Sequence, residues 1–238
     1  MAQSVLHTAA SRGVADHGWL KSYQTFSFSG YFNPERMRFG ALRVLNDDIV
    51  AGSKGFGDHP HDNMEIISIP LSGELKHQDS MGNAAVIREG EIQVMSAGTG
   101  IYHTEYNNLP QEPACFLQIW LFPNQRNVTP RYHQLSYKEL AVPNQWQQLL
   151  SPNPNDEGVW IYQDAWFNKG VFDAGTTTSY TLKKPGNGVY VFVIDGEVEV
   201  NNQPLHARDG LGIWDTDAIT VNISSKADIL LMEVPMTL

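Results

Sequence analysis

Between residues 65 and 95 the chain consists of short runs suited to β-strands, separated by clusters of turn-forming residues. The runs are 65–70, 74–78, 84–87 and 91–95, and the turns are 71–73, 79–83 and 88–90. Gly, Asp, Asn and Ser at such intervals favour tight hairpins. Short strands at this spacing predict an antiparallel sandwich or barrel. The pattern therefore predicts an all-β protein.

Other parts of the chain carry the same signal with less regularity. Further strands are predicted at 24–29, 43–48 and 116–122. Only 137–140 and 145–150 suit short helices. Phe26 and Phe28 would share one face of the first of these strands, where they either pack in the core or place an aromatic ring at the mouth of a pocket.

The second half of the chain weakly repeats the turn pattern of the first half. Residues 72–75 resemble 195–198, so that Gly196 follows Gly73 by 123 residues. Residues 90–93 resemble 210–213 at an offset of 120 residues. A repeat of this kind predicts two copies of one β-unit.

The boundary between the two copies is expected in a loop. Residues 143–158 are rich in Pro and Asn, and 151–158 have the composition of a surface loop. We therefore predict an N-terminal domain at 1–142 and a C-terminal domain at 143–238.

Two histidine-containing pairs flank the hairpin region. His59 and His61 follow a glycine-rich stretch, and His103 and Glu105 follow a second one. Side chains two residues apart on a strand point to the same face. If the two strands face each other inside a barrel, three imidazoles and one carboxylate converge. Imidazole-rich ligand sets suit first-row divalent metals, whereas calcium and magnesium prefer oxygen ligands.

Alternatives stay open on the residues alone. The histidine pair and Glu105 could be solvated surface residues, which would leave the glycines around them unexplained. A closed tetrahedral site would hold structural zinc. A six-coordinate ion would instead keep two positions open for a substrate oxygen and dioxygen. His77, Gln118 and Trp120 are candidate pocket residues, with packing as the alternative for each.

The residues around these pairs resemble the pirin family of the cupin superfamily, in particular bacterial pirins of the quercetinase type. The segments that carry the likeness are His59–Glu65, Glu74–Asn83 and Met95–Asn107. Asp16–Leu20 and Asp209–Asp215 also resemble that subgroup. The resemblance therefore extends over nearly the whole chain.

The resemblance implies a bicupin, with two antiparallel β-sandwich or barrel (jelly-roll) domains in one chain and one metal in the N-terminal half. The family's ligand positions fall on His59, His61, His103 and Glu105. Ordinary cupins place a ligand glutamate a few residues after the histidine pair, which here is Glu65. Four residues lie between Gly98 and His103, which also departs from the ordinary cupin spacing. We take Glu105 as the ligand and Glu65 as a supporting or strand-surface residue.

The implied activity is that of quercetin 2,3-dioxygenase, an oxidoreductase that opens the central ring of a flavonol with dioxygen and releases carbon monoxide. The implied metal is Fe(II), and Mn, Co, Ni, Cu or Zn would also fit the ligands. Glu105 would act as general base for the substrate hydroxyl. Alternatives are a non-enzymatic iron-binding regulator that senses redox state or metal through protein partners, and another cupin reaction such as isomerisation or sugar binding.

The second copy is predicted to lack a metal. Applying the repeat offsets carries the four ligand positions to Leu182, Lys184, Ile223 and Ser225, and none of these supplies a typical ligand. This half would then be structural or would mediate oligomerisation.

Charge and cysteine content limit the partners and the compartment. Sixteen Lys and Arg against 26 Asp and Glu give a net charge of −10. A net negative charge does not favour binding to nucleic acid or to an anionic membrane. The single Cys115 excludes an intrachain disulfide and fits a reducing compartment. No secretion signal or membrane-spanning run is recognisable. We expect a cytoplasmic protein with a flavonol-like substrate, dioxygen and, under the regulatory alternative, a protein partner.

Overall fold

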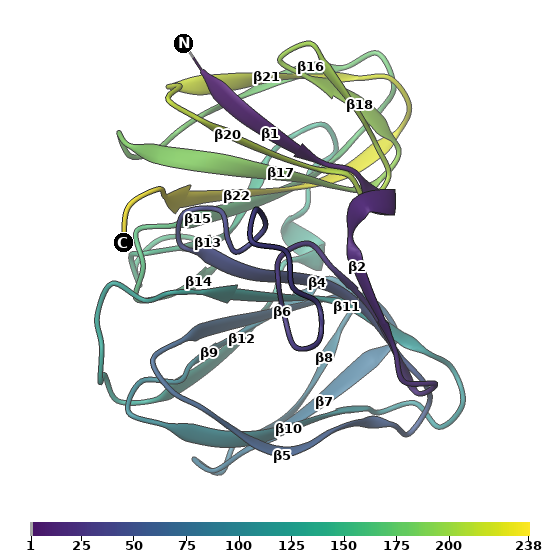
Figure 1. The fold of residues 1–238 in the computed structure, drawn as a ribbon, viewed down its shortest axis with the longest axis vertical. Coiled ribbons are helices and arrows are strands. Elements are labelled where there is room, and N and C mark those ends of the chain that lie inside the picture. Colours follow the sequence, from purple (N-terminus) through teal and green to yellow (C-terminus); the bar gives the residue numbers. More distant parts are fainter. Residues whose placement is uncertain (1) are drawn as a thin grey trace.

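The four strands expected between residues 65 and 95 form in the computed structural model, which describes residues 2–238, but only the second and third of them pair with each other as a hairpin (Figure 1). The four strands are β6 (Glu65–Ser72), β7 (Glu74–Asp79), β8 (Ala84–Arg88) and β9 (Glu91–Ser96). Gly73 turns the chain between β6 and β7 with φ of 76°. Glycine adopts this left-handed conformation without steric cost, because it has no Cβ atom.

These strands belong to a first unit made of two sheets. Its other strands are β2 (Gly13–Asp16), β3 (Leu20–Gln24), β4 (Leu42–Val50), β5 (Gly55–His61), β10 (Ile101–Asn107), β11 (Ala114–Leu121) and β12 (Arg131–Ser136). The large sheet has the order β12-β9-β6-β11-β4-β3-β2, and the small sheet has the order β5-β10-β7-β8. Figure 1 shows the small sheet on the far side of the unit from the second unit.

The second unit repeats this arrangement. Its strands are β1 (Gln3–His7), β13 (Gln147–Ser151), β14 (Val159–Trp160), β15 (Trp166–Phe172), β16 (Thr177–Thr181), β17 (Asn187–Asp195), β18 (Glu197–Val200), β19 (Gln203–His206), β20 (Gly210–Trp214), β21 (Ala218–Ile223) and β22 (Ala227–Pro235). The orders are β1-β20-β17-β22-β15-β13-β14 and β16-β21-β18-β19. The small sheets correspond strand for strand, so the predicted all-β bicupin with an internal repeat is confirmed.

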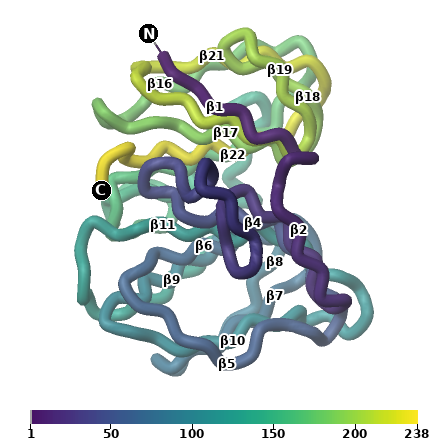
Figure 2. The backbone as a smooth tube through the Cα atoms, viewed as in Figure 1, coloured from purple at the N-terminus to yellow at the C-terminus, as the bar shows by residue number. Residues whose placement is uncertain are grey.

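The first strand of the chain pairs within the second unit. Strand β1 runs antiparallel to β20, with Val5 opposite Gly212. Figure 2 traces this segment along the second unit before the chain crosses to β2. No strand lies between Ser136 and Gln147, and the boundary at 142/143 stays a prediction.

Two other local expectations are wrong. Residues 145–150 do not form a helix, because Gln147–Ser151 is strand β13, which pairs with β15. The strand expected at 24–29 ends at Gln24, because the chain then enters a loop in which Ser27 bonds to the backbone of Asn33. Residues 137–140 are helical only as the 3₁₀ turn Lys138–Leu140; a second such turn within residues 2–238 is Ala9–Ser11. Over residues 2–238, no helix is long and apolar enough to cross a membrane.

The largest apolar core lies between the units rather than inside either one. Its buried side chains come from both large sheets, for example Leu45 and Ile119 from the first and Phe167 and Leu230 from the second. The second unit has its own apolar interior. Among the described residues, the first unit has two small apolar clusters of its own, one around Phe116 and one around Met95. Its interior therefore has room for polar groups.

Candidate metal centre

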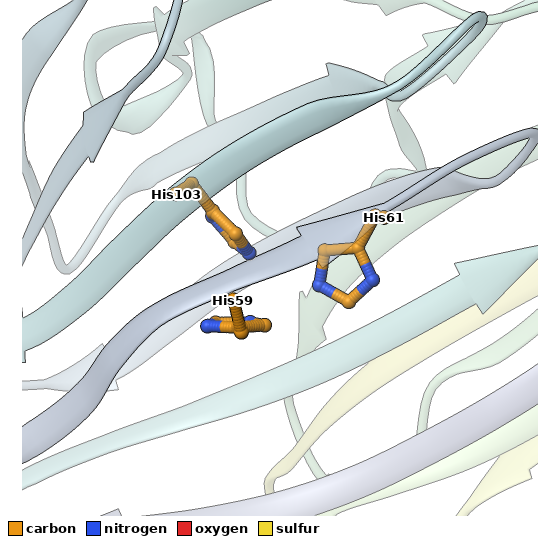
Figure 3. A group of neighbouring side chains, drawn as sticks. All are labelled: His59, His61 and His103. Atoms are coloured by element: carbon orange, nitrogen blue, oxygen red, sulfur yellow. The ribbon is translucent and has the colours of Figure 1, made fainter.

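Strands β5 and β10 bring three histidines together. The strands pair antiparallel with His103 directly opposite His59, and His61 lies on the same face as His59. The ring centroids are 4.4 Å apart for His59 and His103, 4.8 Å for His59 and His61, and 4.9 Å for His61 and His103. One ligand nitrogen from each ring lies within 4.8 Å of the other two. Figure 3 shows the three rings converging from the two strands.

The hydrogen bond of His59 shows which of its two ring nitrogens is free to bind a metal. His59 Nδ1 lies 2.7 Å from the carbonyl oxygen of Gly57. A carbonyl only accepts, so Nδ1 carries a proton, and in the neutral tautomer that this selects Nε2 has the lone pair. Gly57 supplies this contact from two residues away, which fixes the ring in the orientation that a metal ligand needs.

The tautomer of His103 is set by a chain of two more buried residues. His77 Nε2 lies 3.2 Å from Asp79 Oδ2, and His77 Nδ1 lies 3.4 Å from His103 Nδ1. An ionised Asp79 only accepts, so His77 donates from Nε2 and accepts at Nδ1, and His103 donates from Nδ1. His103 Nε2 then carries a lone pair, and among residues 2–238 it has no hydrogen-bond partner.

The charges in this chain agree with that assignment. Burial lowers the pKa of His77 and lowers the pKa of His103 to about 2, with the neighbouring histidines adding to the effect on His103. Burial acts to raise the pKa of Asp79, but hydrogen bonds from Asn83 and His77 outweigh it and lower this pKa. Both imidazoles are therefore neutral and Asp79 is ionised at neutral pH. A buried, neutral His103 with an unpaired Nε2 fits a metal ligand.

His61 faces the cavity beside an aromatic side chain. Its ring meets Trp120 edge to face at 4.9 Å between centroids. Burial, followed by the effect of His59, lowers the pKa of His61 to about 4, which keeps the imidazole neutral and able to bind a metal at neutral pH.

Glu105 is buried in the same region but does not belong to the group of three histidines. Its carboxylate shares a possible ligand group with His77 and His103, not with the pair His59 and His61. Gln118 Nε2 donates to Oε2 at 2.8 Å, and Ser68 Oγ lies 3.3 Å from Oε1. Burial raises the pKa of Glu105 to about 7, against the effect of these two hydrogen bonds. The structure thus brings the three histidines into one group and places Glu105 next to His103.

Glu65 lies in a separate environment. Ser96 Oγ donates to its carboxylate at 2.7 Å, and Arg131 lies close enough to lower its pKa in part. Burial dominates and raises this pKa to about 7. Glu65 belongs to neither of the possible ligand groups found among residues 2–238. Its contacts are those of a structural carboxylate.

A cavity of about 410 Å³ opens against the metal centre. Its wall includes His59, His61 and Glu105, and also the predicted pocket residues Gln118 and Trp120. The aromatic members of the wall are Trp19, Phe28, Phe56 and Trp120. Ligand pockets commonly have such a volume and a mostly apolar wall. His77 is fully buried behind His103 and stacks on Tyr132 at 4.8 Å.

The two phenylalanines predicted to share one face have different roles. Phe26 is buried in the core between the units. Phe28 lines the cavity and meets Trp120 edge to face at 5.2 Å. The core interpretation holds for Phe26, and the pocket interpretation holds for Phe28.

A row of polar residues crosses the large sheet, and its Gln24, Asn46 and Gln118 form the cavity floor; of this row only Gln118 was predicted from the sequence. Adjacent strands of the large sheet place the following residues opposite one another in turn: Gln24, Asn46, Gln118, Ser68 and Gln93. All five are buried. The available signal was a polar residue in the middle of several otherwise apolar strands, such as Gln118 in β11.

The register of the second unit corrects the positions assigned to the repeat. Leu75 pairs with Asn107 in the first unit, and the matching Val198 pairs with Ile223 in the second. Following the pairing back along both small sheets, the equivalents of His59, His61, His103 and Glu105 are Tyr180, Leu182, Ile219 and Val221. All four assignments therefore change, and Leu182, the one residue common to both sets, moves from the position of His59 to that of His61. The predicted positions were wrong because the connecting loops differ in length between the copies.

Comparison with known proteins identifies the family. The Pirin family profile matches residues 6–121, and the profile of the quercetinase C-terminal cupin domain matches residues 148–234. A quercetin 2,3-dioxygenase from Escherichia coli K12 is 40% identical over 230 residues, which cover 97% of this chain and 98% of that protein. The chain belongs to the pirin family. The resemblance seen in the sequence is thereby confirmed.

Other relatives of this pirin agree. A putative quercetin 2,3-dioxygenase from Mycobacterium bovis is 45% identical over 231 residues, covering 96% of this chain and 94% of that protein. The crystal structure of the bacterial pirin YhhW from Escherichia coli in complex with nickel(II) superimposes with a TM-score of 0.93 at 39% identity, covering 98% of this chain and 99% of that one. A metal in a related pirin is consistent with the three-histidine group, but nickel in that protein does not identify the metal of this one.

Proposed function

We propose that this pirin is a metal-dependent dioxygenase that cleaves the central ring of flavonols such as quercetin and releases carbon monoxide. The observation that carries the proposal is the convergence of three imidazoles, two of which, those of His59 and His61, lie in the wall of a cavity with aromatic sides. The names of its relatives support the same substrate class. Dioxygen is the second substrate.

The proposed ligands are His59, His61, His103 and Glu105, and the proposed metal is Fe(II), with Mn, Co, Ni, Cu or Zn as alternatives. The unpaired, buried His103 Nε2 supports its role, and the hydrogen bond from His59 to Gly57 supports a ligand at His59 Nε2. Glu105 lies beside His103 and on the cavity wall, within reach of both a metal and a substrate. When bound, the metal would supply a Lewis acid that lowers the pKa of the substrate hydroxyl.

Glu105 is proposed to take the proton that the flavonol hydroxyl gives up. Its carboxylate faces the cavity, and Gln118 and Ser68 hold it in place through hydrogen bonds. A positioned carboxylate of this kind can act as a general base. Trp19, Phe28, Phe56 and Trp120 would contact the flat rings of the substrate and exclude water from them.

Oxygen uptake tests the proposed activity directly. Metal-free protein is reloaded with Fe(II) without oxygen and then mixed with quercetin and dioxygen, with Mn, Co, Ni and Cu in parallel. Uptake matched by carbon monoxide release is expected, and it should be abolished in His61→Ala. The exposed His206 in the second unit provides the control His206→Ala, which should retain the activity.

A negative result would have a definite meaning. Stoichiometric metal with no uptake for any of these metals would contradict the enzymatic proposal and favour the non-enzymatic regulator that acts through a protein partner. A cytoplasmic location remains part of the proposal and is consistent with the single Cys115.

A further inference from the structure

Three buried oxygens in the cavity have no hydrogen-bond partner within residues 2–238. They are Gln24 Oε1, Asn46 Oδ1 and Asp48 Oδ1, and all three residues line the cavity beside the metal centre. Buried polar atoms are rarely left unpaired in folded proteins. Three acceptors in one wall of one cavity therefore need donors from whatever fills the cavity, and a ligand that displaces water from it must supply them.

The pairing of the strands fixes where this group lies relative to the metal centre. Gln118, which donates to Glu105, is directly opposite Asn46 on the next strand, and Asn46 is directly opposite Gln24 on the strand after that. Neighbouring strands are about 5 Å apart, so Gln24 lies roughly 10 Å from Gln118 along the floor. A ligand held at both places must be longer than a single aromatic ring.

Asp48 completes the group from the same face of β4. It is two residues from Asn46, so both side chains point into the cavity, and it lies opposite Ser22 on β3. Burial raises the pKa of Asp48 to about 7, against the effect of a hydrogen bond from Ser22. A carboxyl group with a pKa near 7 suits an uncharged donor such as a hydroxyl better than a cation, because a bound cation would keep the carboxyl ionised.

The same sheet also places an aromatic side chain with a buried donor at the cavity, because Trp120 follows Gln118 by two residues on β11 and shares its face. Trp120 Nε1 is also buried and unpaired across the described chain, and its ring contacts both His61 and Phe28. A flat ligand would therefore meet aromatic rings on its faces and oxygen acceptors along one edge. Hydroxyl groups on an aromatic ring satisfy both surroundings, because each hydroxyl donates to one group and can accept from another.

We propose that Gln24, Asn46 and Asp48 form a second subsite, away from the metal, that binds the phenolic hydroxyls on an end ring of the flavonol. This inference rests on the proposed function, and it narrows the substrate class to flavonols hydroxylated at that end. Sites built to bind a hydroxyl discriminate strongly against an analogue that lacks it, because their polar groups are then left unpaired. We expect quercetin to bind at least tenfold more tightly than 3-hydroxyflavone, which carries only the hydroxyl at the reacting position.

The experiment measures binding rather than turnover. Metal-loaded protein is titrated with quercetin and with 3-hydroxyflavone in the absence of oxygen, and quenching of tryptophan fluorescence reports on Trp19 and Trp120 in the cavity wall. Asp48→Leu is expected to reduce the quercetin preference by about tenfold, with little change for 3-hydroxyflavone. Asn46→Leu should act in the same direction and serves as a second variant in case Asp48→Leu does not fold. Flavonols hydroxylated on only one end ring then show which ring the subsite binds.

Gln93→Leu is the matched control. Gln93 lies in the same polar row and also has unpaired, buried side-chain atoms, but it does not line the cavity. The same substitution there should leave the preference for quercetin unchanged.

Two outcomes would overturn the inference and are distinguishable. If flavonols bind but the preference is absent, or survives both Asp48→Leu and Asn46→Leu, the subsite is wrong while the proposed function stands. If no flavonol binds to the metal-loaded protein, the flavonol proposal fails and the subsite fails with it.

Discussion

Replacing His77 with phenylalanine tests whether the Asp79–His77–His103 chain prepares the metal centre. His77 is fully buried and is not among the four proposed ligands, but its Nδ1 is the partner of His103 Nδ1. Phenylalanine keeps a ring in the stack with Tyr132. Asp79 keeps its hydrogen bonds from Met81 and Asn83. The substitution therefore removes the acceptor for His103 and one of the hydrogen bonds to Asp79.

The size of the effect follows from that lost acceptor. In the His77→Phe protein, His103 either leaves Nδ1–H buried and unpaired or moves its proton to Nε2, where it competes with the metal. An unpaired buried donor costs about 1–3 kcal/mol. Loss of a group that orients a ligand histidine typically weakens metal binding about 10- to 100-fold, which corresponds to roughly 1.4–2.7 kcal/mol. The two estimates agree, and we expect a loss of affinity in this range.

Competition against a chromophoric chelator at pH 7.5 measures the affinity, with thermal unfolding of the metal-free protein alongside. His133→Phe is the control, because His133 lies on β12 and belongs to neither possible ligand group. A folded His77→Phe protein that binds metal as tightly as the parent would refute the assigned chain of hydrogen bonds. Weakened binding in His133→Phe as well would show that the effect is not specific.

Three further predictions address the base, a buried acid and the core. Glu105→Gln should lower turnover of quercetin by about 10²- to 10⁴-fold if Glu105 is the general base, and parent-like turnover in a metal-loaded Glu105→Gln protein would rule that role out. In metal-free protein, Asp48→Asn should become more stable than the parent as pH rises, because the pKa of Asp48 is about 7 in the folded state and 3.8 in the unfolded state. The free energy of unfolding of the parent then falls by about 1.4 kcal/mol per pH unit between roughly pH 4 and 7. Denaturation at pH 5, 6 and 7 measures the difference. Phe167→Ala, in the core between the units, should cost about 3–5 kcal/mol in denaturant unfolding, and a loss below about 1 kcal/mol would contradict the assignment of a shared core.

The histidines of the site could be predicted because their signal is local. His59 and His61 share a face through the two-residue period of a strand, and the turns around them are marked by glycine. The strands from β6 to β9 could be predicted from the sequence for the same reason. These features need no knowledge of which strands become neighbours.

The cavity floor and the orienting chain could not be predicted, because both depend on the register of strands distant in the sequence. Gln24 meets Asn46 and Asn46 meets Gln118 only once β3, β4 and β11 have paired. His77 reaches His103 only through the pairing of β7 with β10. Strand β13 was mistaken for a helix because its pairing with β15, rather than its local pattern, determines its conformation.

The contrast between the two units suggests why a site of this kind occurs in a double β-unit. Most of the buried side-chain atoms without partners belong to the first unit, including those of Gln24, Asn46 and His103. Each costs about 1–3 kcal/mol when no ligand is bound. The second unit has the same strand order in its small sheet but fills its interior with apolar side chains such as Val198, Val221 and Ile229. Its apolar interior and the core shared between the large sheets offset that cost, so the first unit can keep the polar cavity that the proposed metal and hydroxylated ligand require.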